Sequence, residues 1–389
     1  MSGFATVPAD GPLRVVQVGA GSMGRHWLDV IAGTPEVELV GLVDLDLELA
    51  RRAAAERGLE IVVGDSLTAV AAEARAQAVI DVTVPPAHHA VNTEALFAGL
   101  PVLCEKPIAP TVAETLSLIA SEELSGQLLM TSQSRRYYPV LAELKDAVAG
   151  LRPIGFVTTE FFKAPHFGGF RDEMDHPLLV DMAIHAFDVA RYLLDAVPVS
   201  VDCRTFNPSW SWYRGDAAAT AMFEFAGGTR YTFTGSWCSP GLETSWNGRW
   251  RVSGAGGSAV WDGEDHPEVK FGDGAGVGAG ASGAASGTEG AAGTRPAPRR
   301  SEIAGALDEF VDALRTGRTP SGDVHTNVHS LAMVEAAVRS AGNGRTVALE
   351  SVFEDAYRTA VAQEKRDDVR AVLESWGSAT GFTPRTEQE

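Results

Sequence analysis

Short apolar runs alternate with segments of helical periodicity along the first third of the chain. The runs are LRVVQV from residue 13, VELVGLV at 37–43, IVV at 61–63, residues 78–84, and PVLCE at 101–105. Helical segments lie between them, for example at 47–57 and from about Thr111 to Gly126. Because strands that alternate with helices form parallel sheets, this part predicts a doubly wound α/β domain.

The pattern changes after Gly155 to longer runs that are rich in β-branched and aromatic residues. They occupy 156–162, 220–225, 229–236 and 249–253, and a helical segment at 178–194 interrupts them. Two of the runs flank Gly227 and Gly228 in MFEFAGGTRYTF, which is a strong hairpin signal. This part therefore predicts an antiparallel sheet within an α+β domain.

Residues 273–300 break both patterns because most of them are Gly, Ala, Ser or Thr. Such side chains are too small to build a core, so we expect a flexible surface loop. A mobile lid is the less favoured alternative, since no aromatic side chain is present to grip a ligand. Helices are expected at 301–315 and 324–340, a strand at 346–349, and a helical tail at 350–376 with a frayed end.

Composition and charge narrow the class of protein. A chain of 389 residues is long enough for two domains that each bury a core. The formal net charge of −19 disfavours a nucleic-acid partner, and no apolar run approaches the roughly 18 residues of a membrane span. Cys104, Cys203 and Cys238 form no CxxC pattern, so we expect buried thiols in a reducing cytoplasm.

Three glycines follow the first apolar run with the spacing G-x-G-x-x-G. Gly19 permits a tight turn, Gly21 lets backbone N–H groups approach a pyrophosphate, and Gly24 lets a helix pack against the strand. The loop, with Ser22 and Met23 between the second and third glycines, predicts a phosphate site at a helix N-terminus. A glycine-rich turn with a purely structural role is the alternative.

Asp44 ends the second apolar run, 20 residues after Gly24, where a ribose-binding carboxylate belongs. A carboxylate there accepts hydrogen bonds from the ribose hydroxyls and repels a 2′-phosphate. Leu45 and Asp46 supply no cation to offset that repulsion. NAD is therefore favoured over NADP, although a solvent-facing aspartate at a strand end would look the same in isolation.

Lys106 follows the strand PVLC, at the end of a parallel strand where doubly wound sheets bind ligands. Its ammonium suits hydrogen bonding to a substrate oxygen on which negative charge develops. The alternative is an exposed lysine paired with Glu105.

Asp181 and His185 are spaced i, i+4 on the predicted helix, so both side chains leave one face. A histidine beside a carboxylate suits a general base. A surface ion pair is equally compatible with the spacing, and Asp188 is an alternative partner for His185. A metal is not expected, because no third ligand stands nearby in a recognisable motif.

The ordered set of motifs resembles the Gfo/Idh/MocA family of oxidoreductases, which is named for glucose-fructose oxidoreductase and inositol dehydrogenase. The resemblance covers about residues 13 to 350. It is carried by the glycine loop, Pro85 and His89 in VPPAHH, Glu105-Lys106-Pro107, Arg135-Arg136-Tyr137, Asp181 with His185, Gly235-Ser236-Trp237, and VEAAVRSAGNGRTV at 334–347.

The resemblance implies a Rossmann domain at 1–135, with residues 1–12 flexible, and a substrate-binding and oligomerisation α/β domain at 136–350. A helical tail at 351–389 would follow. The second domain would hold an open, mostly antiparallel sheet whose outer face commonly forms the oligomer contact, giving a homodimer or homotetramer.

It also implies roles for individual residues. Lys106, Asp181 and His185 match the family's catalytic lysine, aspartate and histidine, so His185 would take the hydroxyl proton while a hydride passes to nicotinamide C4. The residues expected to bind the cofactor are Gly19, Gly21, Ser22, Met23, Gly24, Asp44, Pro85, His89, Glu105 and Lys106. Those expected to contact substrate are Arg136, Tyr137, His166, Trp212 and Tyr213, and Arg171 is a weaker candidate.

One departure affects the substrate region. Many members carry a run of glycines before the catalytic aspartate, whereas this chain has DHPLLV at 175–180. The leading expectation is an NAD-dependent dehydrogenase of a sugar, cyclitol or related polyol. Two alternatives stay open: glycoside cleavage through transient oxidation with tightly held NAD, and a sensing protein that keeps the fold without the chemistry.

Overall fold

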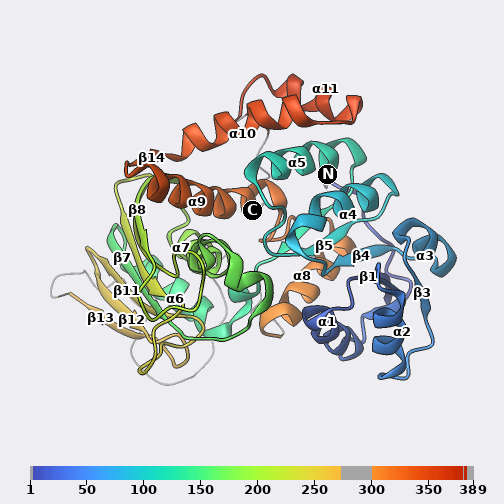
Figure 1. Cartoon of the computed structure of the whole chain (residues 1–389), viewed down its shortest axis with the longest axis horizontal. Helices are drawn as coiled ribbons and strands as arrows, with labels where there is room; N and C mark the ends of the chain where they lie inside the picture. Colours follow the sequence, from blue (N-terminus) through green and yellow to red (C-terminus); the bar gives the residue numbers. More distant parts are fainter. Residues whose placement is uncertain (1–2, 273–299, 380, 383–389) are drawn as a thin grey trace, which may run out of the picture. The chain divides into compact units, whose positions relative to one another are not determined.

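The computed structural model describes residues 3–272, 300–379, 381 and 382, and it divides the chain into two units (Figure 1). The first unit comprises residues 1–137, 299–339 and 347–388, and the second comprises 138–298 and 340–346, together with residue 389. Except for Arg300, the loop predicted at 273–300 lies outside the described residues, as does most of the predicted frayed end.

The first unit is built on a parallel six-stranded sheet with the strand order β3-β2-β1-β4-β5-β6. This confirms the doubly wound Rossmann fold. The strands are β1 (Leu13–Val18), β2 (Val37–Val43), β3 (Val62–Gly64), β4 (Ala78–Asp81), β5 (Val102–Glu105) and β6 (Leu129–Ser132). The connecting helices are α1 (Ser22–Ala32), α2 (Leu47–Ala55), α3 (Leu67–Ala74), α4 (Pro85–Phe97) and α5 (Val112–Ser125).

The ends of α5 agree with the residues that predicted them. The Thr111 hydroxyl accepts a hydrogen bond from the Glu114 backbone N–H, and Gly126 closes the helix with a positive φ of 65°. These caps satisfy backbone groups that helix ends leave unpaired.

The core of the first unit also contains the N-terminal segment and a helix from late in the chain. Phe4 is buried with Trp27, Tyr137 and Phe310, the last of which lies on α8 (Glu302–Thr316). Backbone bonds tie Ala5 N–H to the Gly126 carbonyl at 2.8 Å and Val7 N–H to the Leu314 carbonyl at 2.9 Å. The expectation that residues 1–12 are flexible is therefore wrong for this part, because Phe4 gains a buried apolar environment.

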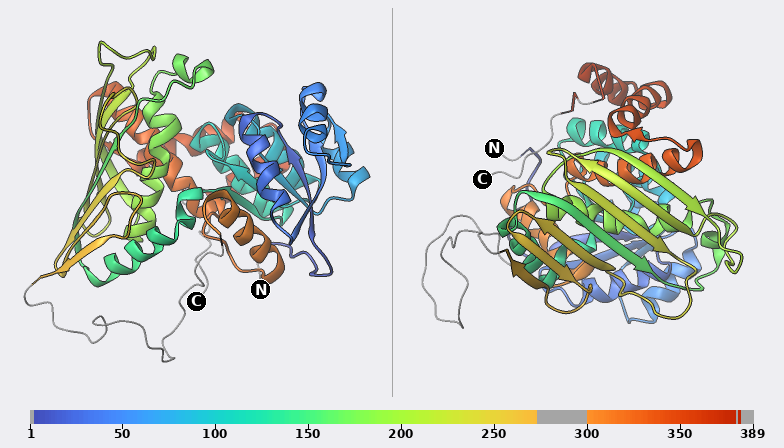
Figure 2. Two further views of the ribbon diagram at one scale, coloured as in Figure 1. Left: turned by 90° about the horizontal axis from the view of Figure 1, so that it is seen from below. Right: turned by 90° about the vertical axis from the view of Figure 1, so that its left-hand side faces the viewer.

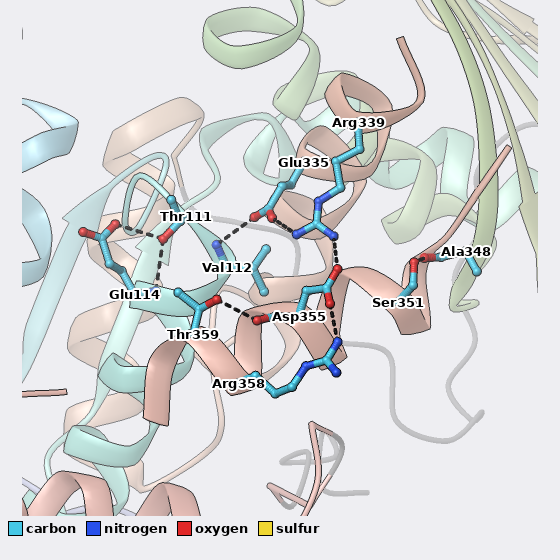
Figure 3. A network of polar contacts seen from close by, with 10 residues as sticks. All are labelled: Thr111, Val112, Glu114, Glu335, Arg339, Ala348, Ser351, Asp355, Arg358 and Thr359. Atoms are coloured by element: carbon cyan, nitrogen blue, oxygen red, sulfur yellow. Dashed lines mark hydrogen bonds and ion pairs between the residues drawn. The ribbon is translucent and has the colours of Figure 1, made fainter. Parts of the chain in front are cut away.

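A polar network explains why the later helices α9 (Val324–Asn343) and α10 (Leu349–Gln363) belong largely to the first unit (Figure 3). Glu335 accepts the Val112 N–H at the start of α5 at 3.1 Å and an Arg339 donor at 2.6 Å. Arg339 in turn donates to Asp355 at 2.8 Å. A final helix, α11 (Asp367–Trp376), also packs on α5.

The structure therefore corrects the predicted domain limits of 136–350 and 351–389. α8, most of α9, and the tail cluster with the first unit. The sequence interpretation missed this because domain membership here depends on contacts between segments more than 200 residues apart.

The second unit contains seven strands of one sheet, in the order β13-β12-β11-β7-β10-β9-β8. β10 pairs with β7 in parallel, whereas β7–β11, β11–β12, β12–β13, β8–β9 and β9–β10 are antiparallel. The predicted β9–β10 hairpin is confirmed. The strands are β7 (Ile154–Phe162), β8 (Pro198–Phe206), β9 (Ala218–Phe225), β10 (Arg230–Ser236), β11 (Arg249–Gly254), β12 (Gly257–Trp261) and β13 (Glu268–Phe271). The short strand β14 (Val347–Ala348) clusters with the first unit.

Two helices of the second unit, α6 (Pro139–Gly150) and α7 (Ile184–Leu194), lie on one face of this sheet (Figure 2). Phe187 on α7 meets Phe223 and Phe233 of the sheet edge-on, with ring centroids 4.8 and 5.5 Å apart. Among the described residues of this unit, no helix covers the opposite face. Because successive strand residues point to opposite faces, one face of the sheet packs against these helices and the other is not covered by a helix of this unit.

Short helical turns complete the described chain: η1 (Ser134–Tyr137), η2 (Gly169–Glu173) and η3 (Leu178–Ala183). None of the helices in the described ranges is both long and apolar enough to span a lipid bilayer.

Candidate active site

The glycine loop between β1 and α1 has the geometry that its spacing predicts. Gly19 has a φ of +101°, and a Cβ there would lie 2.6 Å from the Val82 carbonyl oxygen. A Cβ on Gly24 would lie 2.2 Å from the Gly19 carbonyl oxygen, whereas a Cβ on Gly21 would meet no atom within 4 Å. Gly19 and Gly24 are thus required by the turn itself, and the backbone at Gly21 is open to a ligand.

The N-terminus of α1 favours binding of a negatively charged group at the glycine loop. Gly21 is the N-cap, and no side chain caps the helix. The first N–H groups of a helix without a side-chain cap attract an anion, helped by the helix dipole. Residues 21–23 are exposed, so a pyrophosphate fits this position.

Gln17 holds the loop from beneath, and the sequence interpretation missed it. Its Nε2 donates to the Gly19 carbonyl at 2.7 Å and to the Gly24 carbonyl at 2.9 Å, and the side chain is fully buried. A polar residue inside the apolar run LRVVQV was the available signal.

Asp44 lies beside the glycine loop, as its register predicted. One carboxylate oxygen accepts the Ala20 N–H at 2.7 Å, and the other accepts the Asp46 N–H at 2.9 Å. Leu45, the next residue, is a large apolar residue with an exposed fraction of 91%. The end of β2 therefore combines a fixed carboxylate with apolar surface, which suits an adenosine.

Lys106 follows β5 in a turn that is anchored by its neighbour. The Glu105 carboxylate accepts the Trp27 indole N–H at 2.8 Å and the Lys106 backbone N–H at 3.2 Å. Burial raises the pKa of Glu105, while the Trp27 hydrogen bond and the Lys106 charge oppose that shift. Glu105 thus acts on the backbone of Lys106, and the Lys106–Pro107 peptide bond is cis.

The structure separates the two histidines of VPPAHH. His89 directs Nε2 to the Ser117 hydroxyl on α5 at 3.0 Å, and burial lowers the pKa of His89. Ser117 in turn donates to Glu364 at 2.5 Å. The described contacts of His89 therefore lead to α5 and the C-terminal segment. Its neighbour His88, which the sequence interpretation did not select, contacts the Lys106 turn instead.

Pro85 occupies the first turn of α4, where a proline costs the helix no hydrogen bond.

Arg136 and Tyr137 lie inside the first unit. Tyr137 is 4% exposed, packs in the apolar core and donates its hydroxyl proton to the Glu309 carboxylate. Arg136 is 8% exposed and donates to the Ser321 carbonyl at 2.6 Å. These contacts hold the segment after β6 against α8 and the following loop, and substrate contact by either residue stays a prediction.

In the second unit, Asp181 lies on η3, which is a π-helical turn that leads directly into α7. The predicted helix at 178–194 is thus confirmed in extent, but its first six residues are wider than an α-helix. A π-turn changes the angle between successive side chains, so the i, i+4 spacing did not fix the orientation of Asp181 relative to His185. Such turns often occur at functional sites.

Arg171 is the described partner of Asp181. Its Nε donates to the Asp181 carboxylate at 2.6 Å, and its guanidinium carbon lies 5.4 and 4.7 Å from the ring centroids of Phe167 and Phe170. Phe167 and Phe170 are more than half exposed. This arrangement places a charge pair next to an accessible aromatic surface.

The predicted aromatic contacts of 207–214 are largely used within the unit. His166 stacks on Trp212 with ring centroids 3.6 Å apart, and Tyr213 stacks on Trp237 at 5.9 Å. The Tyr213 hydroxyl donates to the Pro165 carbonyl at 3.1 Å, and burial raises the pKa of Tyr213 to about 12. Tyr213 therefore supports the loop before η2.

Asp81, His88 and Cys104 form a buried cluster whose ligand-type atoms all lie within 4.8 Å of one another. The Cys104 thiol donates to Asp81 at 3.7 Å, and Asp81 also accepts the Thr83 N–H and hydroxyl. Burial raises the pKa of Cys104 well above its usual range, which disfavours the thiolate that binds metals. The cluster fits a hydrogen-bond network better than a metal centre.

Comparisons with known proteins match two segments of the chain to one family. Residues 13–133 match the model of the oxidoreductase family with an NAD-binding Rossmann fold, and residues 160–260 match the GFO/IDH/MocA C-terminal domain. The chain belongs to the Gfo/Idh/MocA family. It is accordingly an oxidoreductase with NAD as its cofactor, as the motifs predicted.

Several relatives in this family have curated descriptions. The uncharacterized protein y4oX of Sinorhizobium fredii is 31% identical over 275 residues, which cover 66% of this chain and 74% of that protein. Inositol 2-dehydrogenase 1 of Saccharopolyspora erythraea is 33% identical over 195 residues, or 49% of this chain and 56% of that protein. D-apiose dehydrogenase of Paraburkholderia graminis is 26% identical over 360 residues, covering 87% and 90%.

Solved structures agree with the fold. An oxidoreductase from Agrobacterium radiobacter in complex with NAD+, L-tartaric acid and magnesium superposes with a TM-score of 0.73 at 19% identity. The match covers 87% of this chain and 99% of that one.

Proposed function

We propose that this Gfo/Idh/MocA protein is a dehydrogenase that interconverts a secondary alcohol and a ketone on a sugar, cyclitol or related polyol. The observation that carries the proposal is the charge arrangement at the η3–α7 junction. There Arg171 binds the Asp181 carboxylate at 2.6 Å, four residues before His185. The names of the relatives, inositol 2-dehydrogenase and D-apiose dehydrogenase, support the same substrate class.

The first unit has the features required to hold NAD. The open backbone at Gly21 and the N-terminus of α1 suit the pyrophosphate, and Asp44 suits the adenosine ribose. NAD supplies a hydride acceptor at nicotinamide C4 when it is bound. The carboxylate at Asp44 favours NAD over NADP by repulsion of a 2′-phosphate.

Three side chains have different roles in the proposed reaction. In oxidation His185 takes the proton of the substrate hydroxyl on a ring nitrogen, and in reduction it returns that proton. Asp181 orients His185 or a substrate hydroxyl, with its own charge balanced by Arg171. The Lys106 ammonium donates a hydrogen bond to the reacting oxygen, which stabilises the negative charge that develops there.

Exposed aromatic rings support a ring-shaped substrate. Phe167 and Phe170 present accessible faces next to the Arg171–Asp181 pair. Sugar and cyclitol rings carry patches of C–H groups that pack on such faces, while their hydroxyls need charged partners like Asp181. His166 and Trp212, stacked on each other, are further candidate contacts.

Assembly and compartment form part of the same proposal. The open face of the second-unit sheet is the expected contact of a homodimer or homotetramer. A reducing compartment such as the cytoplasm is consistent with Cys104, Cys203 and Cys238, which are all buried and free of disulfides.

The test is a spectroscopic screen at about 340 nm for NADH formation against cyclitols, free sugars and glycosides, with NAD and NADP in parallel. His185→Ala should lower kcat by about 100- to 10,000-fold, the range for loss of a general base. His266→Ala is the matched control, because His266 is exposed and pairs with Glu143. No turnover on any panel member would refute the proposal, and glycoside cleavage without net NADH would favour the transient-oxidation chemistry instead.

A further inference from the structure

The turn that carries Lys106 is held from two sides within the first unit. On one side Glu105 binds the Lys106 backbone N–H and the Trp27 indole. On the other side the carbonyl of Pro107 lies 2.7 Å from Nδ1 of His88, a residue on α4 that is 1% exposed. The backbone on either side of Lys106 is therefore contacted by a partly buried carboxylate and a buried histidine.

Both ring nitrogens of His88 face carbonyl oxygens. Nδ1 meets the Pro107 carbonyl, and Nε2 lies 3.1 Å from the carbonyl of Thr83, at the loop between β4 and α4. Carbonyl oxygens only accept, and a neutral imidazole has a single N–H to donate. The ring therefore donates its N–H to one of the two carbonyls, and both carbonyls lie within hydrogen-bond reach of it.

A buried acidic side chain holds the loop that presents the second carbonyl. Asp81, at the end of β4, is fully buried, and it has an oxygen within 4.8 Å of a His88 ring nitrogen. Asp81 accepts hydrogen bonds from the Thr83 N–H at 3.0 Å and the Thr83 hydroxyl at 2.7 Å. The residue whose carbonyl faces His88 Nε2 is therefore itself fixed by a buried hydrogen-bond partner.

We propose that His88 is a positioning residue for Lys106. By bridging the Pro107 and Thr83 carbonyls, it fixes the turn after β5 to the loop after β4 and so fixes the backbone from which the Lys106 side chain projects. The inference rests on the proposed function for its catalytic consequence. Its structural part, that the environment of the Lys106 side chain depends on His88, can be tested without a substrate.

The adjacent histidine supplies a matched control. His89 also lies on α4 and is partly buried, yet its described contact is Ser117 on α5. His88→Leu removes both ring nitrogens that face the Pro107 and Thr83 carbonyls, and His88→Gln keeps an amide N–H donor in their place. His89→Leu removes a histidine of the same helix without touching the Lys106 turn.

The first readout needs no substrate. The chain has five lysines, so reductive methylation of the full protein with ¹³C-formaldehyde gives few NMR signals, and Lys106→Arg assigns the one from Lys106. His88→Leu should shift or broaden the Lys106 signal, His88→Gln should do so less, and His89→Leu should leave it unchanged. An unchanged Lys106 signal in a folded His88→Leu or His88→Gln protein would overturn the proposal.

The second readout is kinetic. Once a substrate is found, kcat in His88→Leu should fall about 10- to 100-fold, the cost of misplacing a catalytic group by about an ångström. His88→Gln should recover part of that loss, and the Kd for NAD should change less than twofold in both. Equal kcat losses in His88→Leu and in the exposed His266→Ala would count against positioning. A silent substrate screen with a shifted Lys106 signal would refute the proposed function and leave the inference supported.

Discussion

The candidate cofactor site of the first unit and the candidate substrate site of the second unit differ in what they are made of. The cofactor site, at the ends of β1 and β2, consists mainly of backbone: glycines without side chains, helix N–H groups, and Asp44, which itself binds backbone N–H groups. The substrate site consists of side chains, with Arg171 bound to Asp181 and aromatic rings around the guanidinium. The backbone geometry of the fold can bind a cofactor that many enzymes share. Recognition of a particular substrate depends instead on individual side chains.

The largest expected effect tests the cofactor site. Gly24→Ala places a Cβ 2.2 Å from the Gly19 carbonyl oxygen, so the loop must move. We expect activity to fall about 100-fold, as for an ångström-scale displacement of a binding group. Gly21→Ala meets no atom of the protein, so it should leave the Tm of the apo protein unchanged and weaken NAD binding alone. Calorimetric titration with NAD measures the loss of cofactor binding, and thermal melts of the apo protein measure the loss of stability. Equal Tm losses would contradict the distinction.

The next effect tests the substrate site. Arg171→Gln leaves Asp181 without its charged donor, and charge-assisted hydrogen bonds contribute about 1.5–3 kcal/mol. We expect kcat/KM to fall about 10- to 100-fold, with partial recovery in Arg171→Lys. Arg214→Gln is the control, since Arg214 binds Glu173 and Asp175 in the neighbouring loop. The measurement is steady-state kinetics on the best polyol substrate. Equal kcat/KM values in the Arg171 and Arg214 variants would show that Arg171 is not part of the site.

A third effect connects the cofactor site to stability. Gln17→Leu removes the donor to the Gly19 and Gly24 carbonyls, and leaving buried carbonyls unpaired costs about 1–3 kcal/mol. Chemical denaturation should show this loss, while the exposed Gln363→Leu should stay within about 0.5 kcal/mol of the wild type. A neutral Gln17→Leu would mean that the loop holds its shape without this side chain.

The smallest effect is expected in the helical network of Figure 3. Arg358 and Arg339 lower the pKa of Asp355, so the stabilisation from this charge pair exists above the unfolded-state pKa. It is lost as the pH falls through the lower folded-state value, below about pH 4. Because Asp355 is about half exposed at 48%, Asp355→Asn should cost well under about 1 kcal/mol at pH 7. Thermal melts should show this small difference shrinking at pH 3 and constant between pH 6 and 8.

Features of this protein that depend on local interactions could be predicted from the sequence, whereas features that depend on contacts between distant segments could not. Thr111 and Gly126 predicted the ends of α5, because capping is local. The glycine spacing predicted a turn whose steric demands at Gly19 and Gly24 involve backbone close by in space. The choice of His89 over His88 was not decided by sequence, since two adjacent histidines differ only in what the surrounding helices and loops bring near them.

Sequence alone determined the doubly wound parallel fold of the first domain and the glycine loop, because these depend on periodicity and glycine spacing. The ordered motifs, through their resemblance to the Gfo/Idh/MocA family, also pointed to the family, the cofactor and the residues proposed for catalysis. Only the tertiary structure decided that Tyr137 is a core residue, that Gln17 supports the glycine loop, and that Arg171 pairs with Asp181 on a π-turn. It also decided that α8 and the C-terminal helices belong with the first unit. Each of these rests on packing or hydrogen bonds between segments whose proximity no local pattern encodes.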